Sequence, residues 1–136
     1  MLQTPAMEHD QSQKGNVLVE FAFILPLFLL LLFGVITFSV ALYNKTVLTM
    51  ATREGARAGA KYVAGQTDNT SRITNAKAAT TLACGNLISF GAVSSTPPTA
   101  TISDNILIVR ASYNYTGVYI FSAPLEIYAE TSMRLE

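Results

Sequence analysis

The chain has 136 residues, of which half are apolar and only 13% are charged, and its mean hydropathy is +0.34. Nine basic and nine acidic residues cancel, so the chain lacks the basic field that nucleic-acid binding requires, and no nucleic-acid partner is expected. One His and one Cys exclude an internal disulfide and argue against a zinc site or a Ser-His-Asp centre. We therefore expect no metal, no cofactor and no catalytic residue.

The apolar residues concentrate near the N-terminus. Residues 1–15 are polar and cannot form a core, whereas residues 21–44 contain no charge. As a helix, those 24 residues would be about 36 Å long, against a hydrocarbon core of roughly 30 Å. The run predicts a transmembrane helix, and residues 45–64 keep a helical composition that continues it.

The middle of the chain predicts a second helix between two loops. Residues 65–70 are rich in turn formers, and Ser71 can cap a helix that reaches about Ile88. Apolar residues recur there at spacings of three and four. A second loop is expected over residues 89–99, where Pro97-Pro98 stops any regular element.

The C-terminal third changes to a period of two. Residues 106–115 alternate, and so does the chain from Leu125, which predicts two strands that each bury one face. Residues 100–103 add a third strand, joined to the second by a tight turn at Asp104-Asn105.

The expected fold class is α+β, with a long membrane helix, one further helix and a small antiparallel sheet of about three strands. The expected division is a leader over 1–15, a transmembrane helix over 16–44 and an α+β domain over 45–136.

The junction before the apolar run carries the most informative pattern. Gly15 ends the polar leader, and Glu20 places a carboxylate at the edge of the hydrocarbon, where it needs a proton, the interface or a cation. A cut after Gly15 would make Asn16 a new α-amine and Glu20 the fifth residue. In a bundle of such helices, the amine of one subunit could pair with Glu20 of its neighbour.

This junction resembles a type IV prepilin processing site, and residues 15–60 resemble the TadE-like family of pilin-like proteins. The motifs are Gly15, the run Val19-Glu20-Phe21-Ala22, Leu25-Pro26 and the block at residues 53–57. Residues 131–136 also resemble the usual end of that family.

The resemblance implies a minor pilin or pseudopilin of a tight-adherence (Flp-type) pilus, not an enzyme. A prepilin peptidase would cut after Gly15 on the cytoplasmic side, and Glu20, Phe21 and Pro26 would serve assembly. The expected partners are that peptidase, other pilins, the inner-membrane assembly platform and membrane lipid. The domain would lie outside the inner membrane, and the protein would take part in pilus initiation, assembly or adhesion.

Three features of the helix admit two interpretations each. Pro26 removes a backbone hydrogen bond, which either lets the helix bend during assembly or is a tolerated kink. The small residues Ala51, Gly55 and Gly59 allow close helix packing, against this chain's own sheet or against another subunit. A basic face either meets a partner or anionic lipid or is simply solvated; it consists of Arg53, Arg57 and Lys61.

Two other functions compete with the pilin interpretation. An ordinary signal peptide could be cut after Ala41, leaving a secreted or membrane-anchored binding domain that begins at Leu42, although the apolar run is long for that purpose. An enzyme would have to use Glu126, Glu130 and Arg134, where an exposed charged ladder is commoner. The charges flanking the helix favour a cytoplasmic domain, whereas the processing pattern requires a cytoplasmic leader; we follow the processing pattern.

Overall fold

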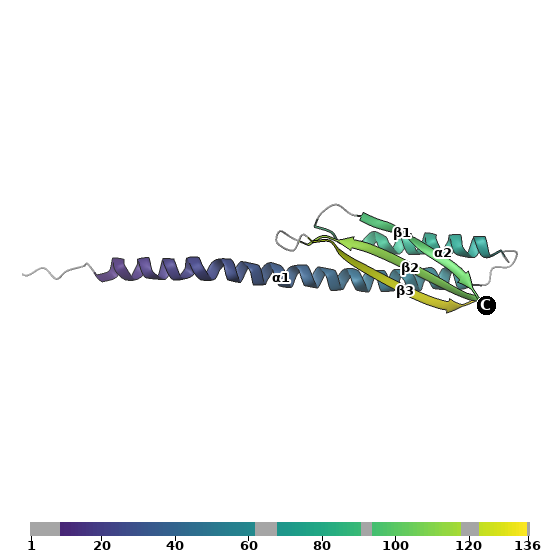
Figure 1. The fold of residues 1–136 in the computed structure, drawn as a ribbon, viewed down its shortest axis with the longest axis horizontal. Coiled ribbons are helices and arrows are strands. Elements are labelled where there is room, and N and C mark those ends of the chain that lie inside the picture. The colour runs from purple at the N-terminus through teal and green to yellow at the C-terminus, as the bar shows by residue number, and fades with distance from the viewer. Residues whose placement is uncertain (1–8, 62–67, 91–93, 118–122, 136) are drawn as a thin grey trace, which may run out of the picture. The chain divides into compact units, whose positions relative to one another are not determined.

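The computed structural model describes residues 9–61, 68–90, 94–117 and 123–135. They form helix α1 (His9–Ala60), helix α2 (Asn69–Ala83), the short 3₁₀ helix η1 (Cys84–Asn86) and strands β1 (Ser94–Ser103), β2 (Ile106–Tyr115) and β3 (Leu125–Arg134). Figure 1 shows these elements along the chain. The predicted α+β class, with one long apolar helix, one further helix and a three-stranded antiparallel sheet, is confirmed.

The chain forms two compact units, residues 1–36 and residues 37–136. The first unit is the N-terminal part of α1. The second unit contains the rest of α1, α2 and the sheet, and it begins at Thr37, eight residues before the domain boundary expected at residue 45.

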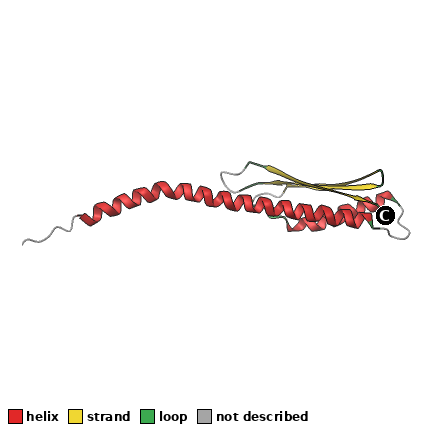
Figure 2. Cartoon of the chain, turned by 90° about the horizontal axis from the view of Figure 1, so that it is seen from below, coloured by secondary structure: helices red, strands yellow, loops and turns green. Residues whose placement is uncertain are grey.

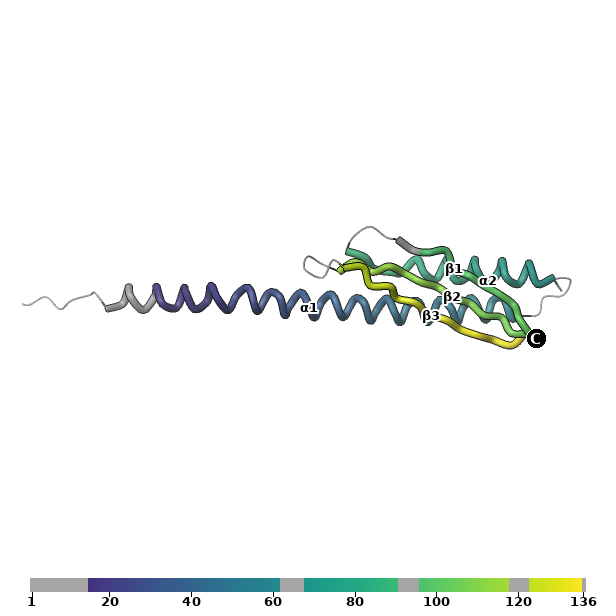
Figure 3. The backbone as a smooth tube through the Cα atoms, in the orientation of Figure 1, coloured from purple at the N-terminus to yellow at the C-terminus, as the bar shows by residue number. Residues whose placement is uncertain are grey.

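In the second unit, the two helices cover one face of the sheet, as Figure 2 shows. Strand order is β1-β2-β3 with both pairs antiparallel, and Figure 3 follows the backbone through them. Alternate β2 residues from Leu107 to Tyr115 are buried as the period of two predicted. They divide between two apolar clusters. One contains Ala56, Ala60, Ala76, Ala100, Leu107, Val109 and Leu135; the other contains Leu48, Ala111, Tyr113, Tyr115, Ile127 and Ala129.

The turn between β1 and β2 is where the sequence placed it. Asp104 and Asn105 have φ angles of 50° and 63°, which the mirror-image hairpin turns require and which Asp and Asn tolerate. Asn105 also holds the end of the chain, since its carbonyl accepts the N–H of Leu135 at 2.9 Å and its amide donates to the Leu135 carbonyl at 3.3 Å.

Two boundaries around α2 were wrong. Asp68, rather than Ser71, caps the helix by accepting the N–H of Thr70 at 3.2 Å, so α2 begins at Asn69. The helix ends at Ala83 instead of Ile88, where the chain changes to the 3₁₀ turn η1. Helix α1 also ends at Ala60 and not at residue 64, and it begins at His9, inside the polar leader.

The expected loop over residues 89–99 was wrong in its second half, because β1 runs through Pro97-Pro98. Proline lacks an N–H and is tolerated in a strand only at an edge or a bulge. Strand β1 is an edge strand, and its register with β2 shifts between Thr96 and Thr99. Residues 118–121 form an apolar run in the sequence that could belong to the core or dock a partner, and they lie outside the described residues.

The two helices of the second unit pack closely because α1 has glycine at their contact. A Cβ at Gly55 would overlap Thr80 Oγ1 and lie 2.9 Å from the carbonyl oxygen of Ala76. A Cβ at Gly59 would lie 2.9 Å from the Arg72 carbonyl oxygen and 2.6 Å from Cδ2 of Leu107. Backbone oxygens cannot move aside without shifting α2.

Gly55→Val is therefore expected to destabilise the domain by about 2 kcal/mol or more, because overpacking a filled contact usually costs about 1–3 kcal/mol. The matched control is Gly85→Val, where no atom lies within 4 Å of the added Cβ, and its expected cost is below about 1 kcal/mol. Denaturant unfolding of the full chain in detergent, followed by circular dichroism, measures both. Equal losses of stability in the two variants would contradict the packing described here.

Candidate functional site

Helix α1 exposes apolar side chains all round in the first unit. Every large aliphatic or aromatic residue from Val17 to Ile36 is exposed. A helix that is apolar on all sides is typical of a membrane span. Among the described residues, α1 is the one helix long and apolar enough to cross a bilayer. The helix thus provides a single-pass membrane anchor near the N-terminus.

The residues of the expected processing site lie in this helix. Gly15, Asn16, Glu20 and Phe21 are all helical and exposed. A Cβ at Gly15 would meet no atom within 4 Å, so the packing of the first unit does not require glycine there. Glu20 makes no ion pair with any side chain in the described part of the chain.

Pro26 lies inside α1, which continues through it without a break in helical assignment. Proline removes one helix hydrogen bond, and a membrane helix can satisfy the freed carbonyl locally. Pro26 is thus an internal residue of the anchor helix.

Asn44 connects α1 to the segment that leads into the sheet. Its side chain is fully buried and pairs with the backbone of Ile88 in both directions. Nδ2 donates to the Ile88 carbonyl at 2.7 Å, and Oδ1 accepts the Ile88 N–H at 3.0 Å. The Asn-Lys-Thr triplet at residues 44–46 also has the form of a glycosylation acceptor, but a side chain buried in this way cannot carry a glycan in the folded protein.

Helix α1 is also tied to strand β3 by two polar contacts. Thr52 and Thr131 share a hydrogen bond of 2.9 Å between their hydroxyl oxygens. Lys45 donates to the backbone carbonyl of Tyr128, and its Nζ lies 4.9 Å from the centre of the Tyr128 ring. At the first residue of the second unit, the Thr37 carbonyl accepts a hydrogen bond from the Tyr115 hydroxyl at 3.2 Å.

The small residues of α1 lie on its buried side. Ala51, Gly55 and Gly59 are buried in this domain, and both glycines contact α2. The sequence offered the chain's own sheet or another subunit as the partner of this stripe. In the structure, the stripe is occupied mainly by α2, with Leu107 of the sheet beyond Gly59.

The basic residues lie on the other side of the helix. Arg53, Arg57 and Lys61 are exposed, and none of them forms an ion pair with another described residue. Lys61 extends the helical hydrogen bonding one residue past α1 by donating its N–H to the Arg57 carbonyl at 3.3 Å. The three cations thus follow one exposed helical face.

The carboxylates considered for an enzyme lie on the outer face of the sheet. Glu130 Oε2 accepts a hydrogen bond from Arg110 Nε at 2.6 Å, and this ion pair raises the pKa of Arg110. Both side chains are largely exposed, and Arg134 lies opposite Ile106 in the register. No group of three metal-ligating side chains occurs among the residues that the structure describes.

Cys84 is half-buried and free, and its burial raises the pKa of the thiol, which keeps it protonated near neutral pH. A protonated thiol is a poor nucleophile.

Comparison with known proteins gives one family. Residues 15–57 match the sequence model of the family described as TadE-like protein. The match confirms the resemblance to the TadE-like family. It begins at Gly15 and ends at Arg57, so it covers the anchor and most of the part of α1 that lies in the domain. No curated protein and no solved structure matches the chain. The resemblance of residues 131–136 to the family's ending stays a prediction.

Sequence reasoning missed the polar residues that connect this TadE-like segment to its domain. The sequence pattern indicated Asn44 only as the last residue of the charge-free run, and it did not indicate Thr52. A signal was present: residues 44, 48, 51 and 55 recur at spacings of four, three and four, which places Asn44 on the buried face of α1.

Asn44→Ala is expected to destabilise the domain by about 2–3 kcal/mol, because it leaves the Ile88 N–H and carbonyl without their partner. Asn114→Ala is the control, since Asn114 is exposed on β2, and its expected effect is within about 0.5 kcal/mol. Thermal unfolding of the full chain in detergent measures both. A midpoint for Asn44→Ala equal to that of the unchanged protein would show that this hydrogen-bonded pair contributes nothing.

Proposed function

We propose that this protein is a minor pilin or pseudopilin of a tight-adherence (Flp-type) pilus. It is inserted as a single-span precursor, cut after Gly15 by a prepilin peptidase and added to the fibre through α1. Its domain lies outside the inner membrane, where it takes part in initiation, assembly or adhesion together with other pilins and the assembly platform. The match of residues 15–57 to the TadE-like family supports this function at its coarse level, a protein associated with the Tad pilus.

The environment of Gly15 is the observation that best supports processing. Glycine inside a helix is less favourable than alanine by about 0.8–1.0 kcal/mol, yet no atom lies close enough to forbid a side chain at Gly15. Folding of this chain therefore gives no reason for glycine at that position. A peptidase that must bring the backbone into its active site does give one, because a missing side chain permits close approach.

The exposure of Glu20 supports the role in assembly. Its carboxylate stands at the start of the charge-free run and has no cation partner among the described side chains. A charged group at this depth is costly unless it is paired. The amine of Asn16, created by the cut, would be that partner when it comes from an adjacent subunit. Phe21 and Pro26 would lie next to this pair and deeper in the helix bundle.

The structure gives a reason to prefer this function over a domain released by signal peptidase after Ala41. Val40 and Ala41 pack against the cluster around Leu48 and Tyr113, and Thr37 accepts the Tyr115 hydroxyl. A cut after Ala41 would remove all three contacts and would divide the second unit, which begins at Thr37.

Gly15→Leu is expected to abolish processing without destabilising the domain. The precursor would then accumulate in the membrane, and an immunoblot would show a single band larger than the mature protein. Gly34→Leu is the matched control within the same helix, and it should be processed normally. Complete processing of Gly15→Leu would contradict a prepilin peptidase site at this position.

Glu20→Ala is expected to leave cleavage intact and to reduce the amount of this protein in sheared pili by about tenfold or more, since close charge pairs contribute roughly 1.5–7 kcal/mol. Glu54→Ala removes an exposed carboxylate outside the charge-free run and serves as the control. Quantitative immunoblotting of the fibre and membrane fractions gives the ratio. Unchanged incorporation of Glu20→Ala would refute the pairing role.

A further inference from the structure

One end of the second unit is formed by parts of the chain that carry no charge. The three longest stretches without Asp, Glu, Lys or Arg are residues 21–44, 78–103 and 111–125. They supply the first residues of α1 in the second unit, η1 with the residues after it, and the end of β2 with the start of β3. We call the described residues 37–44, 84–90, 113–117 and 123–125 the uncharged end.

Contacts within the second unit hold these residues together where the chain enters the unit. Asn44 pairs with the backbone of Ile88 at 2.7 and 3.0 Å. The Tyr115 hydroxyl donates to the Thr37 carbonyl at 3.2 Å, and Tyr115 is the register partner of Leu125 on β3. Figure 1 shows the end of β2 and the start of β3 at this end of the sheet.

The uncharged end exposes large apolar side chains that the core of the domain does not cover. Phe90 is 50% exposed and Leu125 is 55% exposed, although neither residue lies on α1. The exposed large apolar residues of this end are Phe38, Leu42, Tyr43, Ile88, Phe90 and Leu125. A group of exposed apolar residues marks a surface that binds a partner or a membrane.

The membrane is the partner that this end adjoins through the chain itself. Helix α1 is the single-pass anchor, and it continues without interruption from the first unit into the uncharged end. Leu42 and Tyr43 belong to both, because they lie at the close of the anchor's charge-free run. Ile88 is hydrogen-bonded to the next residue, Asn44, so the apolar side chains outside α1 continue a surface that already faces lipid.

The composition of the uncharged end fits the interface between lipid headgroups and hydrocarbon. None of its described residues is charged, so contact with lipid removes no ion from water. Its exposed amides, Asn86 and Asn114, find hydrogen-bond partners among hydrated headgroups. Tyr43 has an apolar ring with a polar hydroxyl, which is the kind of side chain enriched at this level of a bilayer.

The first charged residues beyond this end set the depth of the contact. Lys45 follows Asn44, donates to the Tyr128 carbonyl and has its Nζ 4.9 Å from the centre of the Tyr128 ring. Lysine and tyrosine are typical of the boundary between headgroups and water. Glu126 is an exposed carboxylate directly after Leu125, and a carboxylate in hydrocarbon is costly. The contact is therefore shallow and ends between Leu125 and Glu126.

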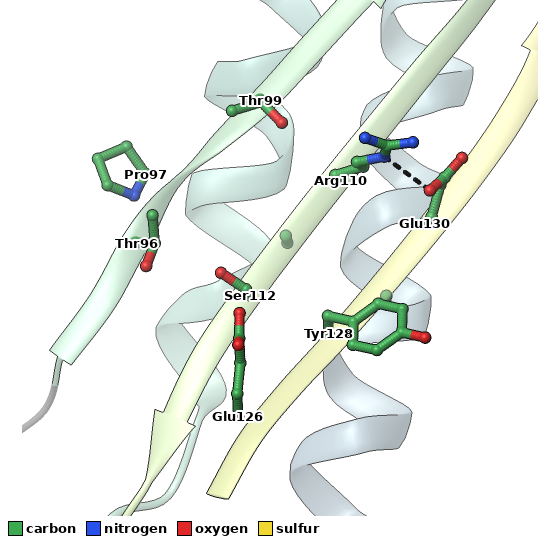
Figure 4. A pocket seen from close by; sticks show the side chains of 10 residues that line it. Thr96, Pro97, Thr99, Arg110, Ser112, Glu126, Tyr128 and Glu130 are labelled. Carbon is green, nitrogen blue, oxygen red and sulfur yellow. Dashed lines mark hydrogen bonds and ion pairs between the residues drawn. The ribbon is translucent and has the colours of Figure 1, made fainter. Parts of the chain in front are cut away.

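The outer face of the sheet lies beyond this limit. It has a hollow of about 360 Å³ that is lined by all three strands, as Figure 4 shows. Glu126 and Glu130 lie along β3 at its rim, and Arg110 pairs with Glu130 at 2.6 Å. These charged side chains keep the hollow in water, so the outer face of the sheet is not part of the lipid surface.

We propose that the uncharged end of the second unit lies on the bilayer, with Ile88, Phe90 and Leu125 inserted between the lipid headgroups. The chain then has a second contact with lipid, apart from its transmembrane helix, which holds the domain against the membrane surface. The proposal rests on the membrane anchor and on neither processing nor fibre assembly.

Spin labels on the full-length chain test this contact in phosphatidylcholine nanodiscs that hold one copy each. In a Cys84→Ala background, Phe90→Cys carries the label at the uncharged end. Ile106→Cys carries the matched label on an exposed apolar residue at the opposite end of β2. Power-saturation electron paramagnetic resonance compares collisions with oxygen, which concentrates in lipid, and with a nickel chelate, which stays in water. Oxygen is expected to dominate at residue 90, and the nickel chelate at residue 106.

A charge introduced at the contact makes the test specific. Leu125→Asp in the Phe90→Cys chain is expected to raise nickel collisions at residue 90 to the level found at residue 106, because a carboxylate is costly in lipid. Met133→Asp changes an exposed apolar residue near the other end of β3 and should leave residue 90 in lipid. Leu125→Cys gives a second label position at the uncharged end, with the same expectation as Phe90→Cys.

Nickel collisions at residues 90 and 125 equal to those at residue 106 would overturn the proposal. If those collisions disappeared only in discs that hold several copies, the surface would belong to a second copy instead. Shielding of both positions from both reagents at one copy per disc would show that the chain itself covers this end, which would also overturn the proposal. None of these results depends on cleavage after Gly15 or on entry into a fibre, so the proposed function is tested separately.

Discussion

One helix has to satisfy two environments, and the rest of the structure depends on that constraint. In the first unit, α1 is apolar on every side, as a lipid environment requires. In the second unit, the same helix has one buried face and one polar face, because it packs under a sheet. The change occurs between Thr37 and Asn44, where side chains first become buried. A cut of the chain between Thr37 and Asn44 would therefore remove part of the domain's core.

The glycines at the two ends of this helix have different surroundings. At Gly55 and Gly59 the absence of a side chain is required by atoms of α2 and of Leu107 that fill the space. At Gly15 the space is empty, and the fold gives no reason for glycine. The packing of the domain therefore requires Gly55 and Gly59, whereas we assign Gly15 to recognition by a peptidase.

The fold was largely predictable because its elements follow strong periodic patterns. The uncharged run, the alternation over residues 106–115 and the turn at Asp104-Asn105 each reflect local sequence, and all three are confirmed. Pro97-Pro98 misled the prediction because proline disfavours strands in general, whereas tolerance at an edge with a bulge depends on the neighbouring strand. The cap at Asp68 was missed because Ser71 is an equally good capping residue by type.

Of the candidate site, the sequence alone could indicate only residues of the TadE-like segment, and the roles of Gly15 and Glu20 stay predictions. The sequence indicated Gly15, Glu20 and the basic residues of α1 from their spacing. It did not indicate the Asn44–Ile88 pair, the Thr52–Thr131 bond or the hollow on the sheet, because each joins residues that are far apart in the chain. Such contacts depend on tertiary packing, which the local pattern does not contain.

The central claim is that a cut after Gly15 leaves α1 continuous from Asn16, at the start of the membrane anchor, into the core of the domain. The mass of the protein extracted from membranes and from assembled fibres, measured on the intact chain and confirmed by N-terminal sequencing, tests it most directly. The expected chain begins at Asn16 in both fractions. A chain that begins at Leu42, or one that retains Met1 in assembled fibres, would contradict it.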